Sequence, residues 1–245
     1  MQRTQIKTRD GDCPLYVYRP RGQGPWPAVL VFMDGLGIRP AMLEIGERLA
    51  TNDYYALVPD LYYRSGPYAP MDPRGIFADP EQRRLLAEKF ASLATPANLM
   101  ADTASLLASL SGQADVRAGP IGTTGYCMGG LMSLTAAGTY GERIAAAASY
   151  HAGRLATDSP DSPHRLAAHI RARVYIAGAS DDPGFPEDMK QRLQAALTAA
   201  GVDHEIETYP ARHGWVLRDT PVYDAACSER HWQTLLGLFD AQLKH

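Results

Sequence analysis

The sequence predicts an α/β fold with a mainly parallel central sheet and helices on both faces. Short apolar runs typical of buried strands alternate with longer segments of helical periodicity. Such alternation favours parallel strands joined by right-handed crossovers. Of the 245 residues, 45% are hydrophobic and 21% charged, which is typical of a globular protein. No repeat or low-complexity tract divides the chain, so we expect residues 1–245 to form a single domain.

The predicted strands are short runs of apolar residues. They are expected at 15–18, 28–32, 56–58, 119–122, 145–150, 174–177 and 204–209. The first two are separated by a turn-rich segment, 21–25, which contains glycines and a proline. Runs of this length suit strands that are buried on both faces of a sheet.

Apolar residues at intervals of three and four predict the helices. These are expected near 42–50, 99–110 and 189–200, with a final helix over about 223–243. The third has a proline and two acids at 186–188 and a glycine just past its end, as helix termini favour. The segment 64–80 is rich in glycine and proline, and we expect it to form a loop over the sheet edge.

Composition and charge argue against several classes of function. Twenty-seven acidic and 24 basic residues give a formal charge of −3, which offers no electrostatic reason to bind nucleic acid or an anionic membrane. No apolar run reaches the roughly 18 residues of a membrane span, and the N-terminus lacks the apolar run of a secretory signal. Cys13, Cys127 and Cys227 show no CxxC spacing, so neither disulfides nor a cysteine zinc site is expected. We expect a cytoplasmic protein with free thiols.

The sequence also gives no indication of a cofactor or a metal. The segment Gly35-Leu36-Gly37 follows a predicted strand, but Pro40 stands where the dinucleotide-binding GxGxxG motif has its third glycine. The histidines are scattered, without the HxxxH or HExxH spacing of a zinc site. We therefore expect neither a cofactor nor a metal ion.

The most informative segment is 121–132. An apolar strand leads into Gly125-Tyr126-Cys127-Met128-Gly129, and a helix-compatible stretch follows, so the segment has the form of a GxSxG nucleophile elbow with cysteine in place of serine. Small residues are needed on either side because the sharp turn brings two backbones close together. Cys127 would then lie at a helix N-terminus, where free N–H groups stabilise a thiolate or an oxyanion. The alternative is a buried structural cysteine in a tight glycine turn.

A nucleophile of this kind needs a histidine and an acid, which follow it along the chain in this fold. His213 comes shortly after the predicted strand at 204–209, at the sheet edge where catalytic groups gather. The loop after the strand at 174–177 carries Asp181 and Asp182, and either could orient His213 and stabilise its imidazolium. Spacing alone does not distinguish them, and the other would serve as a turn or capping residue.

From about residue 28 to residue 232, the chain resembles the dienelactone hydrolase family, the cysteine branch of the α/β hydrolases. The resemblance rests on segments 31–37, 58–62, 125–130, 150–153, 178–186 and 213–215. It implies the α/β-hydrolase fold and a carboxylic-ester hydrolase of the carboxymethylenebutenolidase type. In the family, an apolar residue and often a proline follow the acid after three positions. The resemblance therefore favours Asp182, which Phe185 and Pro186 follow.

The resemblance also implies a carboxylate in the first strand-to-helix loop that holds the resting thiol until substrate displaces it. The matching residue is Asp34, where the best-known members have glutamate. Its alternative role is to cap the following helix. The backbone amide of Gly35 would be one oxyanion donor and that of Met128, directly after the nucleophile, the other.

The pocket is harder to predict than the nucleophile. Candidate pocket residues are Tyr62, Tyr63, Arg64, His151 and Trp215. Among these, Arg64 is the candidate to hold a substrate carboxylate.

The sequence thus predicts hydrolysis of a small activated ester or a dienelactone-like lactone by Cys127, His213 and an aspartate, through a thioester. One alternative is a non-catalytic small-molecule-binding protein on the same fold, but all three candidate catalytic residues are present. Another is a thiol redox or acyl-transfer protein, but neither Cys13 nor Cys227 has the spacing of a resolving cysteine. The sequence makes no prediction about oligomeric state.

Overall fold

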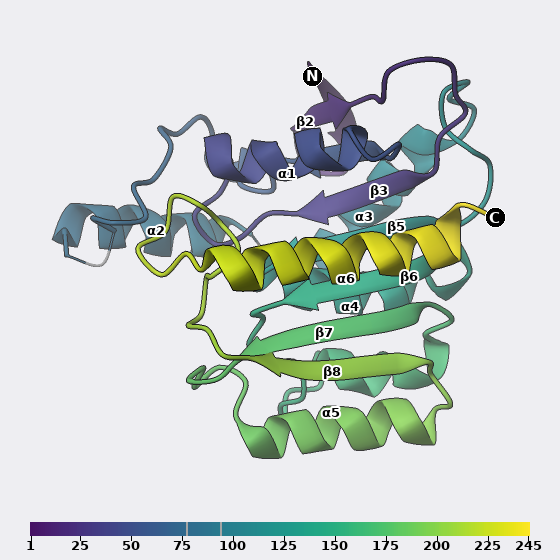
Figure 1. Ribbon diagram of the computed structural model, residues 1–245. Coiled ribbons are helices and arrows are strands. Elements are labelled where there is room, and N and C mark those ends of the chain that lie inside the picture. The colour runs from purple at the N-terminus through teal and green to yellow at the C-terminus, as the bar shows by residue number, and fades with distance from the viewer. Residues whose placement is uncertain (77, 94) are drawn as a thin grey trace.

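The structure is a computed structural model that describes residues 1–76, 78–93 and 95–245. In this part of the chain, eight strands form one sheet in the order β1-β2-β4-β3-β5-β6-β7-β8 (Figure 1). The strands are β1 (Gln2–Thr8), β2 (Gly11–Tyr18), β3 (Ala28–Phe32), β4 (Tyr55–Pro59), β5 (Ile121–Tyr126), β6 (Ile144–Tyr150), β7 (Arg173–Ala179) and β8 (His204–Tyr209). Strands β3 to β8 are parallel, and β1 and β2 pair antiparallel at one edge. The predicted α/β fold with a mainly parallel sheet is confirmed.

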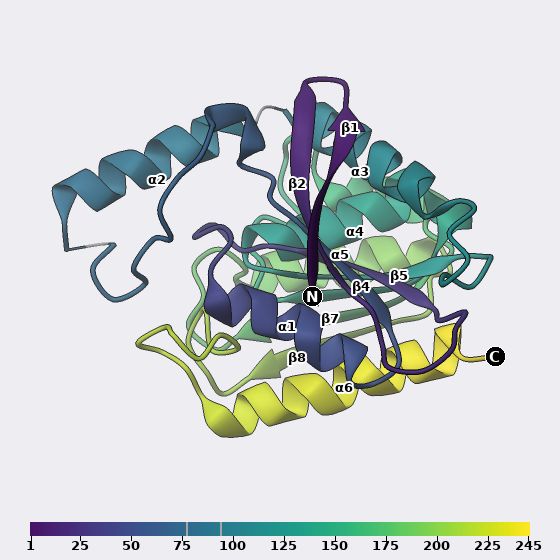
Figure 2. The ribbon, with the colours of Figure 1, turned by 90° about the horizontal axis from the view of Figure 1, so that it is seen from above.

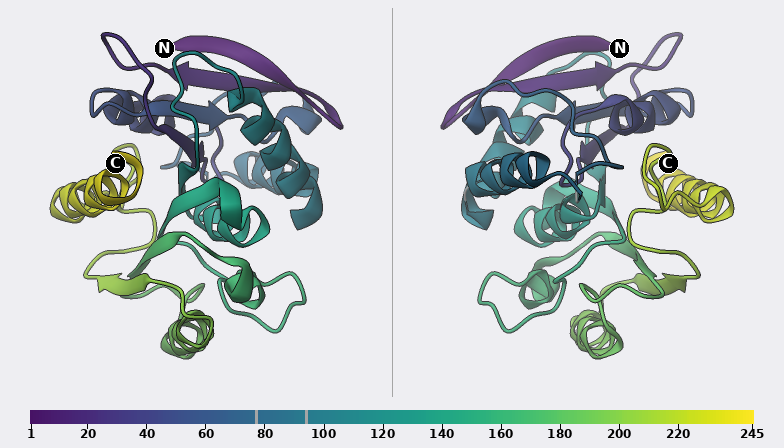
Figure 3. Two further views of the ribbon diagram at one scale, coloured as in Figure 1. Left: turned by 90° about the vertical axis from the view of Figure 1, so that its right-hand side faces the viewer. Right: turned by 90° about the vertical axis from the view of Figure 1, so that its left-hand side faces the viewer.

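Helices cover both faces of the sheet. They are α1 (Pro40–Ala50), α2 (Pro80–Ser92), α3 (Pro96–Leu110), α4 (Met128–Thr139), α5 (Glu187–Ala199) and α6 (Ala225–Leu243), with short 3-10 turns at Tyr63–Ser65, Gly141–Arg143 and Pro163–His169. Figure 3 shows α1 and α6 on one face and α3 and α4 on the other. Figure 2 shows α2 projecting beyond the body of the sheet. No helix formed by the described residues is long and apolar enough to cross a membrane.

The middle of the sheet forms the core. All five residues of β3 and all six of β5 are buried, as expected for parallel strands covered on both faces. The prediction of 119–122 for the latter strand began two residues early and ended four residues early. The middle of this strand contains Thr123 and Thr124, which are polar but buried, and the Thr123 hydroxyl forms a 2.8 Å hydrogen bond with that of Ser133 in α4. Internal hydrogen bonding of this kind makes a polar residue compatible with a buried strand.

Two elements were not predicted. Strand β1 is an edge strand whose first four residues are exposed, so it has no apolar run to reveal it. Helix α2 has few apolar residues, but its start carries a clear signal: Asp79 precedes Pro80, and its carboxylate accepts the N–H of Glu81. The expected loop at 64–80 therefore ends where α2 begins, and Phe77 within it lies outside the described residues.

The connection from β5 to α4 depends on two glycines. A Cβ atom on Gly125 would lie 2.0 Å from the carbonyl oxygen of Gly129, and a Cβ on Gly129 would lie 2.3 Å from that of Phe32 in β3. Both neighbours are backbone atoms of buried elements and cannot move aside. The strand, the turn and the helix can therefore approach one another only when these positions lack a side chain.

We predict that Gly125→Ala destabilises the fold by at least ~3 kcal/mol, because the added methyl group overlaps backbone and not a movable side chain. Soluble yield and the thermal midpoint, measured by circular dichroism, test this. Gly237→Ala in α6 is the matched control, since its Cβ meets nothing within 4 Å. It should stabilise the protein by ~0.5–1 kcal/mol through helix propensity. A Gly125→Ala protein with the wild-type midpoint would contradict the steric argument.

Candidate active site

Cys127 occupies the turn between β5 and α4. Its backbone is held at φ 53° and ψ −117°, in the left-handed half of conformational space that non-glycine residues seldom adopt. The Cys127 N–H donates to the carbonyl of Tyr150, at 3.0 Å, and to Nδ1 of His151, at 3.1 Å. Cys127 is half-buried and is the N-cap residue of α4. Strain of this kind is typical of a nucleophile held in a fixed direction.

His213 and Asp182 are brought together by the loops that follow β8 and β7. Nδ1 of His213 lies 2.6 Å from Oδ2 of Asp182, whose other oxygen accepts the N–H of Gly184 at 2.8 Å. Asp182 is buried, whereas Asp181 is exposed. The geometry thus distinguishes the two aspartates that spacing left open: Asp182 contacts the histidine.

The electrostatics of the three side chains favour charge separation. Burial lowers the pKa of His213, but hydrogen bonds to Asp182 and to the side chain of Cys127 outweigh it and raise that pKa to about 10. Burial raises the pKa of Asp182, and the hydrogen bond with His213 reverses this, so that the pKa lies below its ordinary value. The contacts on both sides of the ring therefore favour the protonated form of His213.

The loop after β3 presents backbone amides beside Cys127. The N–H of Leu36 donates to Oδ1 of Asp34, and that of Gly37 to the Asp34 carbonyl. Within residues 1–76, 78–93 and 95–245, no partner is found for the N–H of Gly35. Met128 is the first residue of α4, where helix geometry leaves the N–H without an intrahelical acceptor. The two predicted oxyanion donors are therefore both available for a ligand.

Asp34 is engaged in a buried ion pair with Arg39. Both of its oxygens accept from the guanidinium of Arg39, at 2.7 and 2.8 Å, and Arg39 is 2% exposed. Arg39 also binds Asp219, at 2.7 Å, in the loop that carries His213. Both carboxylate oxygens of Asp34 are thus committed to Arg39, and the thiol-holding role at position 34 stays a prediction. Asp34 does not cap α1, since it accepts the Leu36 N–H in a turn before that helix.

Tyr63 and Arg64 are directed away from the elbow, contrary to their prediction as pocket residues. The Arg64 guanidinium binds Asp10 and Asp102, each at 2.7 Å. The Tyr63 hydroxyl donates to Asp102 and is hydrogen-bonded to that of Thr8. Both side chains join the β1–β2 hairpin to α3, so Arg64 has two carboxylates of its own and does not serve a substrate.

Three other predicted pocket residues do lie around the elbow. Tyr62 is fully buried and donates its hydroxyl proton to the Gly35 carbonyl at 2.6 Å, which fixes the loop after β3. His151 is buried with its ring centroid 5.1 Å from that of His213 and 5.0 Å from that of Trp215. Tyr62 thus packs under the loop after β3, and Trp215 packs against His151. His151 itself contacts the backbone of Cys127 and the ring of His213.

Sequence reasoning missed Arg39, Asp219 and Phe90. A Cβ on Gly35 would lie 2.7 Å from the Phe90 ring, so this ring of α2 packs against the loop after β3. The cap signal at 79–81 could have revealed α2, but not where its ring would lie. Nothing in the sequence pairs Arg39 with Asp219, which is 180 residues away.

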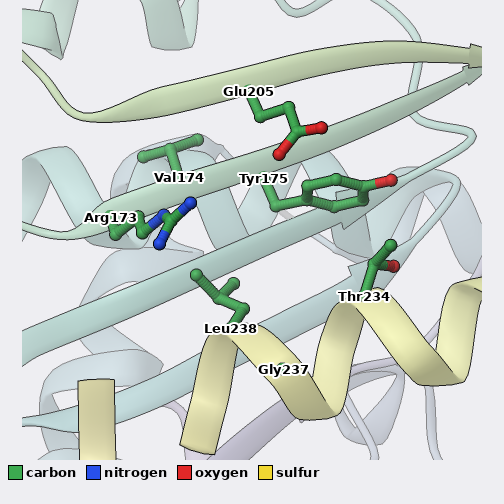
Figure 4. Close-up of a pocket in the computed structure, with 7 residues that line it drawn as sticks. All are labelled: Arg173, Val174, Tyr175, Glu205, Thr234, Gly237 and Leu238. Carbon is green, nitrogen blue, oxygen red and sulfur yellow. The ribbon is translucent and has the colours of Figure 1, made fainter. Parts of the chain in front are cut away.

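A separate cavity of about 260 Å³ lies between α6 and the first halves of β7 and β8 (Figure 4). Two of its polar groups already have partners: Arg173 pairs with Asp203, and the Tyr175 hydroxyl donates to Glu207. It opens at the opposite end of the strands from Cys127. Within the described part of the chain, His, Cys, Asp and Glu side chains form no group of three or more that could hold a metal ion.

The sequence profile of the dienelactone hydrolase family matches residues 14–243. The chain belongs to the dienelactone hydrolase family. This membership covers the elbow, the loops that bear Asp182 and His213, and the loop after β3. The protein is therefore a dienelactone hydrolase-like hydrolase with an α/β-hydrolase fold.

Several relatives align with this chain, some of them over almost its whole length. The Escherichia coli K12 protein named "Putative carboxymethylenebutenolidase" is 31% identical over 242 residues, covering 96% of this chain and 85% of that protein. The "Carboxymethylenebutenolidase" of Pseudomonas sp. strain P51 is 32% identical over 117 residues, 48% of this chain and 46% of that one. The crystal structure titled "Putative Dienelactone Hydrolase" from Klebsiella pneumoniae superposes with a TM-score of 0.83 at 26% identity, covering 97% of each chain.

We predict that Arg39→Met lowers the free energy of unfolding by about 3–5 kcal/mol, because it leaves the Asp34 carboxylate buried without its cation. Urea unfolding measures this. The double variant Arg39→Met/Asp34→Asn should recover most of the loss, since a neutral amide needs no counter-charge. Arg218→Met is the control: its pair with Glu44 is exposed and should contribute at most ~1 kcal/mol. Equal losses for the Arg39→Met single and double variants would show that packing, not charge, is lost.

Proposed function

We propose that this protein hydrolyses small esters or lactones through a thioester on Cys127, with His213 as acid and base and Asp182 as the residue that orients it. The observation that carries this proposal is the 2.6 Å contact between Asp182 and the His213 ring, since the hydrogen bonds of that ring to Asp182 and to Cys127 together raise the pKa of His213 to about 10. An imidazolium beside a thiol at a helix N-terminus stabilises the thiolate, which is the nucleophilic form.

In the acylation step, the thiolate of Cys127 attacks the substrate carbonyl carbon and forms the C–S bond. The carbonyl oxygen becomes an oxyanion, for which the amides of Gly35 and Met128 are available donors. The intermediate collapses to a thioester as the C–O bond to the leaving group breaks. His213 donates its proton to the departing oxygen and is left neutral.

In the deacylation step, neutral His213 removes a proton from a water molecule that attacks the thioester carbonyl. The C–S bond breaks, the acid product leaves, and the protonated His213 again faces the thiolate. Asp182 keeps Nδ1 of His213 in its hydrogen bond through both steps, so Nε2 stays directed at the thiol.

The chemistry of the nucleophile indicates the substrate class. A thiolate leaves more readily than an amine from a tetrahedral intermediate, so amides are poor substrates for a cysteine site of this kind. An enol ester or enol lactone has a stabilised enolate as leaving group and suits it well. The names of the E. coli and Pseudomonas relatives, which refer to a butenolide, agree with a lactone substrate.

We predict that Cys127→Ala abolishes hydrolysis, by at least ~10³-fold, without lowering the thermal midpoint. A panel of aryl acetates and a dienelactone, followed by absorbance, measures this. Turnover that survives in Cys127→Ala would refute the mechanism. If the wild-type protein binds these ligands but hydrolyses none, a binding protein on this fold is the better description.

The two aspartates provide a matched pair. Asp182→Asn should lower kcat by at least ~10²-fold, because the amide does not hold the imidazolium. Asp181→Asn should change kcat by less than about twofold, since Asp181 is exposed and does not contact His213 in the structure. Steady-state kinetics with one activated ester suffices. The assignment fails if Asp181→Asn is the more damaging change.

The pair should also make stability depend on pH. His213 has a raised pKa, so its contribution is fully present below the ordinary value of 6.5 and is lost as pH rises towards about 10. Asp182 has a lowered pKa, so its contribution is present above 3.8 and is lost as pH falls below this. We predict that Asp182→Asn lowers the thermal midpoint most between about pH 4 and 6.5, and least near pH 10. A midpoint difference that does not change with pH would contradict this linkage.

A further inference from the structure

His151 contacts Cys127 and His213, two of the three residues in the proposed mechanism, but it takes no part in the steps described above. It follows β6 directly, and its Nδ1 accepts the N–H of Cys127 at 3.1 Å. Its ring meets that of His213 edge to face, with centroids 5.1 Å apart and planes at 63°. One imidazole therefore contacts both the backbone of the nucleophile and the side chain of its base.

The ring is buried and uncharged. His151 is 1% exposed, and its Nε2 has no partner among the described residues. Tyr126 of β5, His231 of α6, and His213 and Trp215 from the loops after β8 surround it, with no carboxylate among these neighbours. Burial, reinforced by His213 and His231, lowers the pKa of His151 well below 6.5. Nδ1 thus remains a hydrogen-bond acceptor, with the ring proton on Nε2.

The backbone of His151 is strained to hold the ring in this place. Its φ of 41° lies in the left-handed region, which costs a non-glycine residue roughly 1–2 kcal/mol. Its own N–H donates to the carbonyl of Ala177 in β7, at 2.8 Å, which anchors the turn to the neighbouring strand. Glycine, which has no Cβ, would relieve this strain, so the presence of a histidine here is consistent with a role for its side chain.

We infer that His151 is a positioning residue, which holds the amide of Cys127 beside His213 and so fixes the distance between the thiol and its base. This inference rests on the proposed function, since it assigns His151 a part in the same site. The elbow residue sits at a sharp turn, where a small rotation about its backbone moves the sulfur. A displacement of about 1 Å at such a centre can lower the rate by ~10²-fold.

Two substitutions test separately the two properties of the His151 side chain, its hydrogen-bond acceptor and its planar ring. His151→Asn keeps an acceptor where Nδ1 lies and tolerates the left-handed backbone. His151→Phe keeps the shape of a planar ring but removes the side-chain acceptor, which leaves the Cys127 N–H with the Tyr150 carbonyl alone. His164→Asn is the matched control, because His164 is a half-buried histidine on a different turn, hydrogen-bonded to Ser162.

The measurements are kcat and KM with one activated ester, and the rate at which iodoacetamide alkylates Cys127 as a function of pH. The alkylation midpoint reports the pairing of the thiol with His213 and needs no substrate. We expect His151→Phe to lower kcat by about tenfold with KM within twofold, and to move the midpoint to higher pH. His151→Asn should keep the wild-type midpoint, and His164→Asn should match wild type in every respect.

The inference is overturned if His151→Phe keeps the wild-type kcat and midpoint, or if His151→Asn moves the midpoint as far as His151→Phe does. Thermal midpoints of all variants separate these effects from loss of folded protein. If no ester or lactone is hydrolysed at all, the proposed function fails, but the alkylation profiles still decide whether His151 positions the thiol.

Discussion

The close approach of β5, α4 and β3 is the constraint on which the site depends. Gly125 and Gly129 allow backbone atoms to pass within distances that no side chain would permit. Cys127, between them, is forced into a left-handed conformation and projects at the start of α4. The direction of the thiol is therefore set by the packing of the sheet, and the loops around it have only to supply partners.

Those partners come from three loops at the same edge of the sheet, and ion pairs hold the loops together. Arg39 joins the loop after β3 to the loop after β8, through Asp34 and Asp219. Asp182 joins the loop after β7 to His213. Each buried carboxylate at this edge thus has a cation, as burial of charge requires. The two pairs fix the loop after β3 and His213 relative to the same turn at Cys127.

The sequence predicted well the features that require a local motif. It predicted poorly the contacts between residues that are far apart in the chain. The glycines of the elbow, and the order of nucleophile, acid and histidine, follow from the fold, so the segments bearing Cys127, Asp182 and His213 were predictable. The partners of Asp34 and Arg64 were not predictable. A charged residue near a strand end has the same sequence pattern whether it binds a substrate or pairs with a side chain far away in the chain. The outward-facing β1 lacked any apolar signal.

The spacing of these partners along the chain has a consequence for biosynthesis. Asp34 and Arg39 are five residues apart and leave the ribosome together, so they can pair early. Asp219 follows Arg39 by 180 residues, and His213 lies in the same late segment. A nascent chain that ends before β8 would carry the nucleophile without its base. Such long-range contacts form slowly, so chemical competence arises last, when the C-terminal segment has docked.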